Sequence, residues 1–546
     1  MKNIRILIVI PARGGSKGIP RKNLRLLNDN PLLYYSIKTA LSSKFNSDVV
    51  VSSDDDEILA YARIFGAIPY KRSEELGGDE ITLDPVIFDA YKYMSKEFVY
   101  DYVITMQTTS PILKKESLDE AITLMLYKKL DTVISATDDT HLMWEDRHGI
   151  FVPLYEKRLN RQFLPKTLKE TGGFLICRSK ILSKNTRIGK EVELFKLNHG
   201  EEIDIDTYED WAICESLMKR KTIIFVVSGN VKVGLSHVYR CLLLANGILD
   251  NEIIFISGKK DQLAHKIIKE HHYTSINVEN IFKYIKNVRP NLVINDILNT
   301  SESYIKDIKG VGSKVINFED MGDGAVFADA VINDMYCDES KIKGQSNHVY
   351  NGPEYFCLRS EFRYIGKKVV TKNINSILIA FGGVDACNHT LTVLSSIADY
   401  CLKNNIFIRV VLGLGYEKVK TLDYFSGEKY TNIAINDDIT ELASYIYESD
   451  LVFTARGRTV YEVATIGVPT IVIPQNIREE CHMFAKESNG FLTFGVEEYS
   501  SPSKLLRMFS NLTKDYDRRS KMSGLMNCWD FTDNVSKILK IIRNNL

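Results

Sequence analysis

The side chains best suited to bind an anion lie in a glycine-rich, basic loop near the start of the chain, "IPARGGSKGIPRKN", residues 10–23. Glycines let backbone amides approach an anion that a side chain would otherwise obstruct. The loop has neither the GxxxxGK[ST] nor the GxGxxG spacing, so it predicts a phosphate site of another kind, with a solvated basic turn as the alternative. The glycines are Gly14, Gly15 and Gly18, and the basic side chains are Arg13, Lys17, Arg21 and Lys22.

A second candidate site is the acidic segment "EEIDIDTYED", residues 201–210, in which Asp204 and Asp206 alternate with isoleucines. The alternation predicts a strand, and residues two apart in a strand point to the same face. Two carboxylates on one face repel each other unless a cation lies between them, and a divalent metal that prefers oxygen can also bridge phosphate oxygens. The pair therefore indicates a magnesium site, with an exposed edge strand as the alternative.

Two further groups of residues in the second half of the chain could act on a diphosphate. His237 follows a glycine-bearing loop at the start of an amphipathic helix, and its neutral-range titration suits proton transfer; a helix cap or a solvent-facing residue is the alternative. The segments "ILIAFGGVDACNHT" and "LVFTARGRTVYEVATIG" each lead a strand into a glycine and a helix. Two helix N-termini could each contribute ~0.3–1 kcal/mol toward an anion. Glu462, one turn into the last helix, could reach ribose hydroxyls, or is an exposed helical acid.

These residues need a scaffold, and the apolar pattern predicts α/β sheets. The first 220 residues alternate helical segments with strand-like runs at 4–10, 48–53, 101–106, 131–136 and 172–177. Parallel α/β sheets bind nucleotides at the carboxyl ends of their strands, where the first loop lies. A basic helix end and a fresh strand at "TIIFVV" predict a domain boundary near residue 221. The remainder divides into two lobes, about 222–370 and 371–530, and a C-terminal helix is expected to return to the first of them.

The bulk composition excludes several classes of partner. At 546 residues and 45% apolar content the chain exceeds one usual core. It carries 70 basic and 70 acidic side chains, so no overall field recruits nucleic acid or a membrane surface. No segment approaches a signal peptide or a membrane span, and the nine cysteines form no CxxC pair. We expect a cytoplasmic protein with reduced, mostly buried thiols.

The motifs "IPARGGSKGIPRKN", "VVSSDD", "MQTTSPI", "RQFLP" and "IDIDTYED" occur in this order over about residues 1–218. This part of the chain resembles the CMP-sialic acid synthetases, the cytidylyltransferases that activate sialic, legionaminic and pseudaminic acids. The resemblance implies transfer of CMP from CTP to a nine-carbon 2-keto sugar acid, with release of pyrophosphate and with Mg²⁺, or alternatively Mn²⁺, as the metal. It assigns CTP to Arg13, Gly14, Gly15, Lys17, Lys22, Asn23, Ser52, Asp79 and Thr82, the sugar acid to Gln107 and Arg161, and the metal to Asp204 and Asp206.

The same resemblance assigns catalytic roles to Asp206, Asp204, Arg161 and Lys17. Asp206, as a metal ligand, is the residue whose loss should abolish turnover, and Asp204 either shares the metal or orients the attacking hydroxyl. A guanidinium such as Arg161 can hold a carboxylate or phosphate with two parallel hydrogen bonds. The chain reads "MQTTSP" where the family often has "LQPTSP", and "ETGG" at 170–173 where "RNGA" is frequent. Both departures lie on the implied sugar side, so they bear on the choice of sugar and not on the nucleotide. A cytidylyltransferase for an eight-carbon sugar acid is the alternative.

The second half, about residues 222–530, resembles the UDP-sugar hydrolase of pseudaminic acid synthesis and, more distantly, two-Rossmann glycosyltransferases. The motifs are "GLSHVYRCLLLA", "YFCLRSEF", "FGGVDACNHT" and "GRTVYEVATIGVPTI". The resemblance implies hydrolysis of a UDP-linked 2,4-diacetamido-2,4,6-trideoxy sugar, with His237 orienting or deprotonating the attacking water. It assigns the UDP-sugar to Gly234, His237, Gly382, Gly383, Gly457, Thr459 and Glu462. The chain departs from the family at Ser228, Ser236, Arg458 and Ile477. A non-catalytic UDP-sugar-binding module and a glycosyltransferase are therefore the alternatives.

Together the two resemblances imply an α/β protein with a Rossmann-like nucleotidyltransferase domain over residues 1–220 and a two-lobed, glycosyltransferase-B-like domain over 221–546. They also imply a bifunctional enzyme of nonulosonic acid biosynthesis. The step between the two reactions, condensation of the free sugar with phosphoenolpyruvate, is not encoded here, so a separate condensing synthase is an expected partner. Synthetases of the first family are commonly dimeric, which implies a homodimer through the N-terminal domain.

Overall fold

The computed structural model describes residues 4–16, 18–78, 80–230, 233–335, 348–413, 415–416, 420–437, 439, 441–495 and 501–546. The chain forms two compact units, Met1–Arg220 and Lys221–Leu546, called here the first and second unit. In the described part of the chain no helix combines the length and the apolar character that a membrane crossing requires. The eight described cysteines are all free thiols, and five of them are buried.

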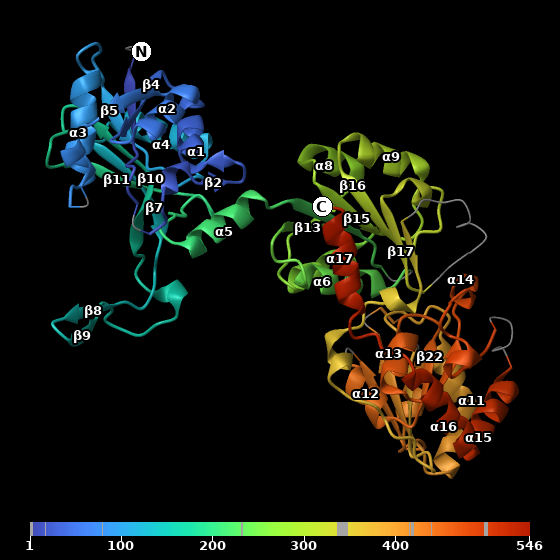
Figure 1. Ribbon diagram of the computed structural model, residues 1–546. Coiled ribbons are helices and arrows are strands. Elements are labelled where there is room, and N and C mark those ends of the chain that lie inside the picture. Colours follow the sequence, from blue (N-terminus) through green and yellow to red (C-terminus); the bar gives the residue numbers. More distant parts are fainter. Residues whose placement is uncertain are drawn as a thin grey trace. The chain divides into compact units, whose positions relative to one another are not determined.

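The first unit is built on a seven-stranded sheet (Figure 1). In spatial order the strands are β11 (Val192–Lys196), β7 (Thr132–Asp138), β10 (Leu168–Arg178), β6 (Tyr102–Thr105), β1 (Ile6–Pro11), β4 (Ser47–Ser53) and β5 (Ile68–Lys71). Strand β10 is antiparallel to β6 and β7, whereas the other neighbours are parallel. The five strand-like runs predicted from the sequence are all strands of this sheet, which confirms the α/β class.

Side chains of β1 alternate between two cores because both faces of the sheet are covered. Ile6, Ile8 and Ile10 pack in one core with α1 (Leu32–Leu41) and α4 (Lys115–Lys128). Leu7 and Val9 pack in the other with α3 (Leu83–Met94). The remaining helices of this unit are α2 (Asp56–Ile64) and α5 (Tyr208–Met218). Burial on both faces fixes the register of β1, and with it the place where the glycine-rich loop begins.

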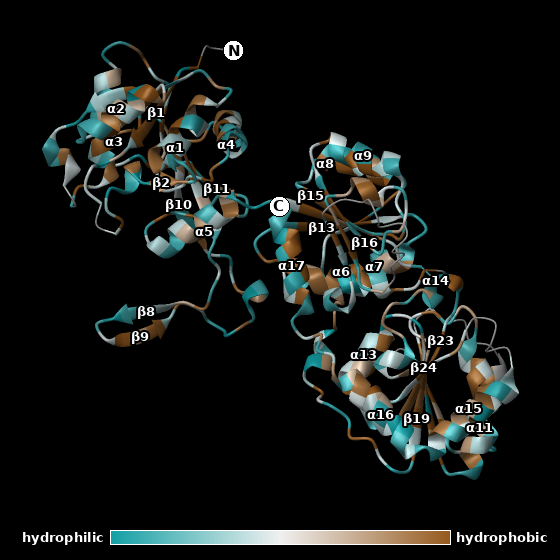
Figure 2. Ribbon diagram, turned by 45° about the vertical axis from the view of Figure 1, so that its right-hand side comes forward, coloured by the Kyte–Doolittle hydropathy of each residue, from teal (hydrophilic) through white to brown (hydrophobic). Residues whose placement is uncertain are grey.

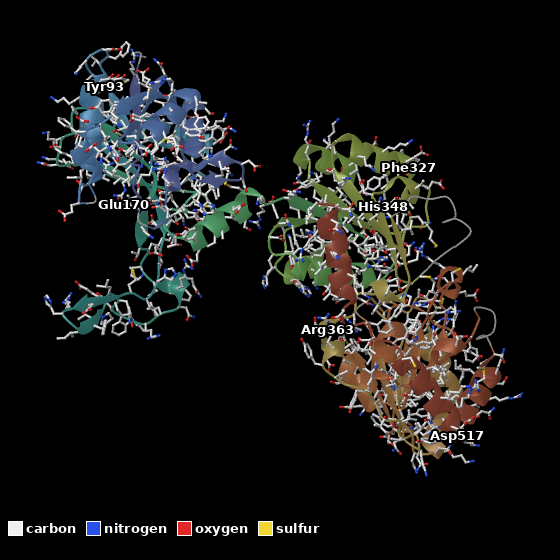
Figure 3. The ribbon with its side chains drawn as sticks, viewed as in Figure 1. Tyr93, Glu170, Phe327, His348, Arg363 and Asp517 are labelled. Carbon is white, nitrogen blue, oxygen red and sulfur yellow. The ribbon has the colours of Figure 1, made fainter. Side chains whose placement is uncertain are left out.

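Two irregular features lie between β7 and the end of β10. The hairpin of β8 (Trp144–Arg147) and β9 (Ile150–Pro153) extends away from the sheet of the first unit (Figure 1), and most of its large side chains are exposed. The pairing of β10 with β7 shifts register between Glu170 and Leu175. Glu170, labelled in Figure 3, is exposed just before this shift. The shift contains the "ETGG" segment, which therefore departs from a regular ladder.

The first lobe of the second unit is a seven-stranded parallel sheet. Its strands in spatial order are β14 (Ser275–Val278), β13 (Glu252–Gly258), β12 (Thr222–Val227), β15 (Leu292–Asp296), β16 (Lys314–Phe318), β17 (Ala330–Asn333) and β18 (Val349–Asn351). Phe225 on β12 packs toward α6 (Ser236–Asn246), α7 (Gln262–Glu270) and the C-terminal helix α17 (Asn534–Asn544). Val226 packs toward α8 (Ile281–Val288) and α9 (Glu302–Gly310) on the opposite face. Helix α17 thus returns to this lobe.

The second lobe is a six-stranded parallel sheet in the order β21 (Ile433–Asp437), β20 (Phe407–Leu412), β19 (Ser376–Ala380), β22 (Leu451–Ala455), β23 (Thr470–Ile473) and β24 (Phe491–Thr493). Its helices are α11 (His389–Lys403), α12 (Ala443–Glu448), α13 (Thr459–Ile466), α14 (Ile477–Glu480), α15 (Pro502–Lys514) and α16 (Tyr516–Asn527). Figure 2 shows the strands of this lobe in brown between helices with one apolar face. The two-lobed α/β plan is the one that the sequence predicts.

The predicted strand over the twin aspartates is wrong. Residues 203–206 run without a sheet partner, and α5 begins at Tyr208. Thr207 and Asp210 form a capping box, which commits the following residues to a helix. Ile205 fills a small core beside α5, which explains why an isoleucine alternates with the acids even though no strand is present.

Candidate functional site

The glycine-rich loop leaves the carboxyl end of β1 and is tied back to its own start. Asn23 Nδ2 donates to the Arg13 carbonyl at 2.8 Å, and Thr108 Oγ1 donates to Asn23 Oδ1 at 2.6 Å. The Gly14 amide donates to Asp54 Oδ1 at 3.3 Å. The loop is therefore anchored to the segments that follow two neighbouring strands, β4 and β6. This edge of the sheet is where α/β proteins hold nucleotides.

Ile205 and Asp206 of the acidic segment lie against this loop, although more than 180 residues separate the two segments. Lys22 Nζ donates to the Ile205 carbonyl at 2.7 Å and lies 3.2 Å from Asp206 Oδ1. A Cβ on Gly18 would lie only 2.6 Å from the Asp206 carbonyl oxygen, so no larger residue fits at this position without a shift of backbone. The loop and the acidic segment thus form one side-by-side arrangement.

A second group of oxygens converges beside Asp204. Within the described residues, Asp204 Oδ1, Thr109 Oγ1 and Ser110 Oγ are buried and have no hydrogen-bond partner. A Cβ on Gly172 would lie 3.0 Å from Thr109 Oγ1, 3.1 Å from Asp204 Oδ1 and 3.2 Å from Ser110 Oγ. A glycine at the β10 register shift therefore leaves a small polar space between three unsatisfied oxygens. Buried polar atoms without partners are costly unless a ligand satisfies them.

The acidic residues fit a magnesium site. Asp204 offers a buried oxygen without a partner, and the Asp206 carboxylate is mostly exposed beside Lys22. Among the described residues no group of three or more His, Cys, Asp or Glu side chains is placed to hold a metal ion by itself, so a metal here would need ligands from the substrate or water besides these two carboxylates. Mg²⁺ is commonly held by one or two carboxylates plus substrate phosphates and water, which matches this donor set.

The other residues predicted to bind CTP are distributed along the same edge. Ser52, at the end of β4, has a buried hydroxyl without a partner among the described residues. Thr82 precedes α3 in extended conformation, and its side chain makes no capping bond. Gly15 is exposed in the loop. Lys17 and Asp79 lie outside the described residues, so their predicted roles are not tested.

The two predicted sugar contacts differ in their surroundings. The backbone N–H of Gln107 donates to the Gly172 carbonyl at 3.1 Å, which places the Gln107 backbone next to the three unsatisfied oxygens. Arg161 is exposed in the short helix η3 (Arg161–Phe163), and no hydrogen bond within the described ranges links it to another candidate residue. The structure thus brings Gln107, but not Arg161, into the group formed by the loop and the acids.

Sequence reasoning missed Asp54 and Arg72. Arg72 follows β5 and is buried, and its Nη2 donates to Asp54 Oδ1 at 3.0 Å. Burial lowers the pKa of Arg72, opposed by the charge of Asp54. Because Asp54 also accepts the Gly14 amide, the pair braces the glycine-rich loop. The available signal was positional, since Asp54 and Arg72 follow the carboxyl ends of β4 and β5, the two strands on one side of β1.

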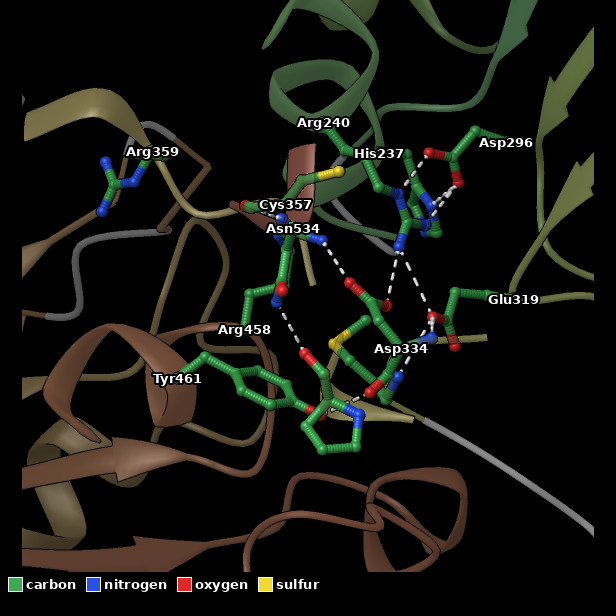
Figure 4. Close-up of polar contacts among 12 residues, drawn as sticks. His237, Arg240, Asp296, Glu319, Asp334, Cys357, Arg359, Arg458, Tyr461 and Asn534 are labelled. Carbon is green, nitrogen blue, oxygen red and sulfur yellow. Dashed lines mark hydrogen bonds and ion pairs between the residues drawn. The ribbon is translucent and has the colours of Figure 1, made fainter. Parts of the chain in front are cut away.

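In the second unit the predicted catalytic histidine is buried and paired, not a solvent-facing residue. His237 Nδ1 lies 2.5 Å from Asp296 Oδ1 (Figure 4). Arg240, one turn further along α6, donates from Nη2 to Asp296 Oδ1 and from Nε to Asp296 Oδ2, each at 2.8 Å. Burial alone would raise the pKa of Asp296, but Arg240 and His237 hold it well below its ordinary value.

Arg240 also contacts a second pair of acids. Its Nη1 lies 3.0 Å from Asp334 Oδ1 and 3.4 Å from Glu319 Oε1, at the ends of β17 and β16. Burial and the neighbouring Asp334 raise the pKa of Glu319 well above its ordinary value. Burial also acts on Asp334, but Arg240 keeps its pKa low. Burial therefore favours the protonated form of Glu319, whereas Arg240 favours the ionised forms of Asp296 and Asp334.

Arg458, one of the departures from the family pattern, joins the two lobes. From the start of α13 its Nη1 reaches Asp334 Oδ2 at 3.3 Å, and its Nη2 donates to the Cys357 carbonyl at 2.7 Å (Figure 4). Its guanidinium also lies 4.5 Å from the centre of the Phe356 ring. Asp334 of the first lobe thus pairs with the charge of Arg458. Arg458, from the second lobe, therefore forms a contact between the two lobes.

The predicted glycine loops of the two lobes approach each other. Gly234 and Gly382 have φ of 85° and 82°, which favour glycine. A Cβ on Gly383 would lie 3.7 Å from the Leu235 Cβ, so the loop after β19 lies against the turn before α6. Gln475, which sequence reasoning missed, holds the loop by accepting the Ala386 amide at 3.1 Å and donating to the Phe381 carbonyl at 3.2 Å.

The last group lies at the start of α13. Glu462 is buried, not an exposed helical acid, and its Oε1 accepts from Arg359 Nε at 2.7 Å. Gly457 precedes the helix with open space at its Cβ position, and Thr459 is the first helical residue. Among the described residues, no hydrogen bond links the other departures from the family pattern to Glu462 or Arg359. Ser236 and Ile477 are exposed, and the Ser228 backbone N–H donates to the Asp296 carbonyl at 3.2 Å.

Comparison with known proteins identifies the first unit. Residues 7–198 match the family model described as cytidylyltransferase. The pseudaminic acid cytidylyltransferase of Campylobacter jejuni is 32% identical over 236 residues, which cover 40% of this chain and 97% of that protein. The chain belongs to the cytidylyltransferase family. The cytidylyltransferase unit is also 30% identical over 225 residues to the CMP-N,N'-diacetyllegionaminic acid synthase of Legionella pneumophila, again 40% of this chain and 97% of the relative.

Two further matches differ in extent. An uncharacterized protein of Methanocaldococcus jannaschii, MJ1062, is 33% identical over 280 residues, or 48% of this chain, and the chain spans 57% of its length. The crystal structure of Acinetobacter baumannii MurG superimposes with a TM-score of 0.44 and 14% identity, over 59% of this chain and 99% of that one.

Proposed function

We propose that the cytidylyltransferase unit transfers CMP from CTP to a nine-carbon 2-keto sugar acid and releases pyrophosphate. The observation that carries the proposal is the meeting of the glycine-rich loop with the acidic segment, in which Lys22 contacts Ile205 and Asp206 at 2.7 and 3.2 Å. The names of the Campylobacter and Legionella relatives support pseudaminic or legionaminic acid as the acceptor, and sialic acid is the third candidate.

In this proposal some residues of the site bind the triphosphate and others bind the sugar acid. The anomeric hydroxyl oxygen bonds to the α-phosphorus and its proton passes to solvent, while the bond from that phosphorus to the bridging oxygen breaks and pyrophosphate leaves with the electron pair. Such transfer needs positioning and charge neutralisation more than covalent help. Loop amides and Lys22 hold phosphates, and Thr109 and Ser110 receive hydroxyls of the sugar acid; Asp204 either shares the metal or orients the attacking hydroxyl. The family resemblance, rather than a contact in the structure, is the ground for proposing that Arg161 and Lys17 supply further charge. Magnesium, or alternatively manganese, held by Asp204 and Asp206, would neutralise phosphate charge.

A substrate panel tests this proposal. The full chain, CTP and Mg²⁺ are mixed with pseudaminic, legionaminic, sialic or an eight-carbon sugar acid, and pyrophosphate release is followed. The proposal predicts release with at least one nine-carbon acid and loss of turnover by orders of magnitude in Asp206→Asn. Turnover with the eight-carbon acid alone would replace the acceptor class, and a fully active Asp206→Asn would refute the metal-ligand role.

For the second unit we propose hydrolysis of a UDP-linked 2,4-diacetamido-2,4,6-trideoxy sugar to UDP and free sugar. Support comes from the buried His237–Asp296 contact and from the approach of the two glycine loops. The full chain is given the UDP-sugar, and UDP release is measured for wild type and His237→Ala. Tight binding without release would favour a non-catalytic binding module. Release only with an added acceptor would favour a glycosyltransferase.

Two partners follow from this assignment. The free sugar and the nine-carbon acid differ by three carbons, so a separate condensing synthase that uses phosphoenolpyruvate must act between the two reactions. We also propose a homodimer through the cytidylyltransferase unit. Its β8–β9 hairpin exposes Trp144, Ile150 and Phe151 by 52%, 69% and 67%, which favours burial against a second copy. Light scattering of the full chain, with Phe151→Asp as a test variant, would detect such a dimer.

A further inference from the structure

The buried charges around His237 are arranged to fix one ring nitrogen as the donor. The side chains of Asp296 and Arg240 are 0% and 1% exposed, and that of His237 is 7% exposed. An ionised carboxylate only accepts hydrogen bonds, so the 2.5 Å contact requires that Nδ1 carry the proton. The lone pair of the neutral imidazole is then on Nε2. Asp296 thereby selects the tautomer that a base acting through Nε2 needs.

Arg240 in turn fixes the carboxylate. It donates to both Asp296 oxygens at 2.8 Å, so the carboxylate can neither rotate nor turn its second oxygen toward the ring. Arg240 is itself held at its other end by Asp334, 3.0 Å away, and lies over the Phe318 ring. His237 and Arg240 stand three residues apart on α6, so both reach the same carboxylate at the end of β15.

We propose that Asp296 and Arg240 are positioning residues that make His237 a base acting through Nε2 in the second unit. The inference rests on the hydrolase function proposed above. In the step, the oxygen of a water molecule bonds to the anomeric carbon while Nε2 accepts one of its protons. The bond between that carbon and the β-phosphate oxygen breaks, and UDP departs with the electron pair. The imidazolium then returns its proton to solvent, so the residues end as they began.

The test combines kinetics with a spectroscopic signature in the full chain labelled with ¹⁵N-histidine. Wild type is expected to show one strongly deshielded Nδ1–H resonance, assigned to His237 by its absence in His237→Ala. Asp296→Asn should remove this resonance and lower kcat for UDP release by ~10²–10⁴-fold, the range for a misplaced general base, with KM unchanged. Arg240→Lys, which loses the paired donors, should weaken both readouts.

Asp320→Asn is the matched control because Asp320 is a buried carboxylate of the same lobe that contacts Thr300 and Asn317 instead of His237. It should keep both the resonance and kcat. Persistence of the resonance in Asp296→Asn, its loss in Asp320→Asn, or an unchanged kcat in Asp296→Asn would overturn the positioning role. If wild type releases no UDP, the proposed hydrolase fails, and the resonance then tests only the tautomer: its loss in Asp296→Asn supports selection of the Nδ1–H form by Asp296, and its persistence overturns that selection.

Discussion

Gly18→Ala should damage the cytidylyltransferase site without adding or removing a charge. The new Cβ would lie 2.6 Å from the Asp206 carbonyl oxygen, whereas ordinary contacts begin at 3.4 Å, so the two backbones must separate by about 0.8 Å. That movement acts on Lys22, whose Nζ is 2.7 Å from the Ile205 carbonyl and 3.2 Å from Asp206. A misplacement of ~1 Å in a site that works by positioning can lower the rate ~10²-fold.

Steady-state pyrophosphate release, with CTP varied, measures this effect. We expect kcat/KM for CTP to fall by ~10²-fold and the free energy of unfolding to fall by ~1–3 kcal/mol, as for an overpacked site. Gly15→Ala is the matched stability control, because no atom lies within 4 Å of its Cβ position, and it should unfold like wild type. Wild-type kinetics and stability in Gly18→Ala would refute the close approach of loop and acidic segment.

Three other substitutions probe separate parts of the account. Gly172→Ala places a Cβ 3.0–3.2 Å from three unsatisfied oxygens, so steady-state kinetics should show a raised KM for the sugar acid with the KM for CTP unchanged. Arg458→Ala leaves Asp334 with one cation fewer and should lower the free energy of unfolding of the second unit by about 3–5 kcal/mol in urea, with partial recovery in Arg458→Lys. The pKa of Glu319 is raised by burial and Asp334, so the stability that its proton provides at low pH is lost as pH rises through that pKa. Glu319→Gln, which is always neutral and still faces Arg240 and Asp334, should therefore gain stability relative to wild type as the pH rises above the ordinary glutamate pKa of 4.5; a constant difference in urea unfolding would contradict the raised pKa.

The sheets could be predicted from the sequence because parallel strands that are buried on both faces appear as nearly continuous apolar runs. The alternation around Asp204 and Asp206 misled because an extended segment with one buried isoleucine has the same pattern as a half-buried strand. A strand differs from such an extended segment in having a hydrogen-bonded partner strand, and the local sequence pattern does not show whether a partner strand is present. The expected meeting of these acids with the glycine-rich loop did not depend on the strand.

The positioning groups were harder to predict than the groups they hold. His237 has a local signal, a histidine at a helix start after a glycine, but its partner Asp296 comes from a strand 59 residues away. The same holds for Arg359, whose contact with Glu462 spans 103 residues. Such pairs are set by tertiary packing, and a single sequence has no periodicity that points from one member to the other.

The central claim is that the glycine-rich loop and the twin aspartates surround one metal-bound CTP. Electron paramagnetic resonance of Mn²⁺ with the full chain and CTP tests it directly. The account predicts that CTP tightens Mn²⁺ binding, that the bound ion shows phosphorus hyperfine coupling, and that Asp206→Asn weakens this binding whereas Glu209→Gln, the same change of charge in α5, does not. Equal Mn²⁺ binding in Asp206→Asn and wild type, or bound Mn²⁺ without phosphorus coupling, would contradict it.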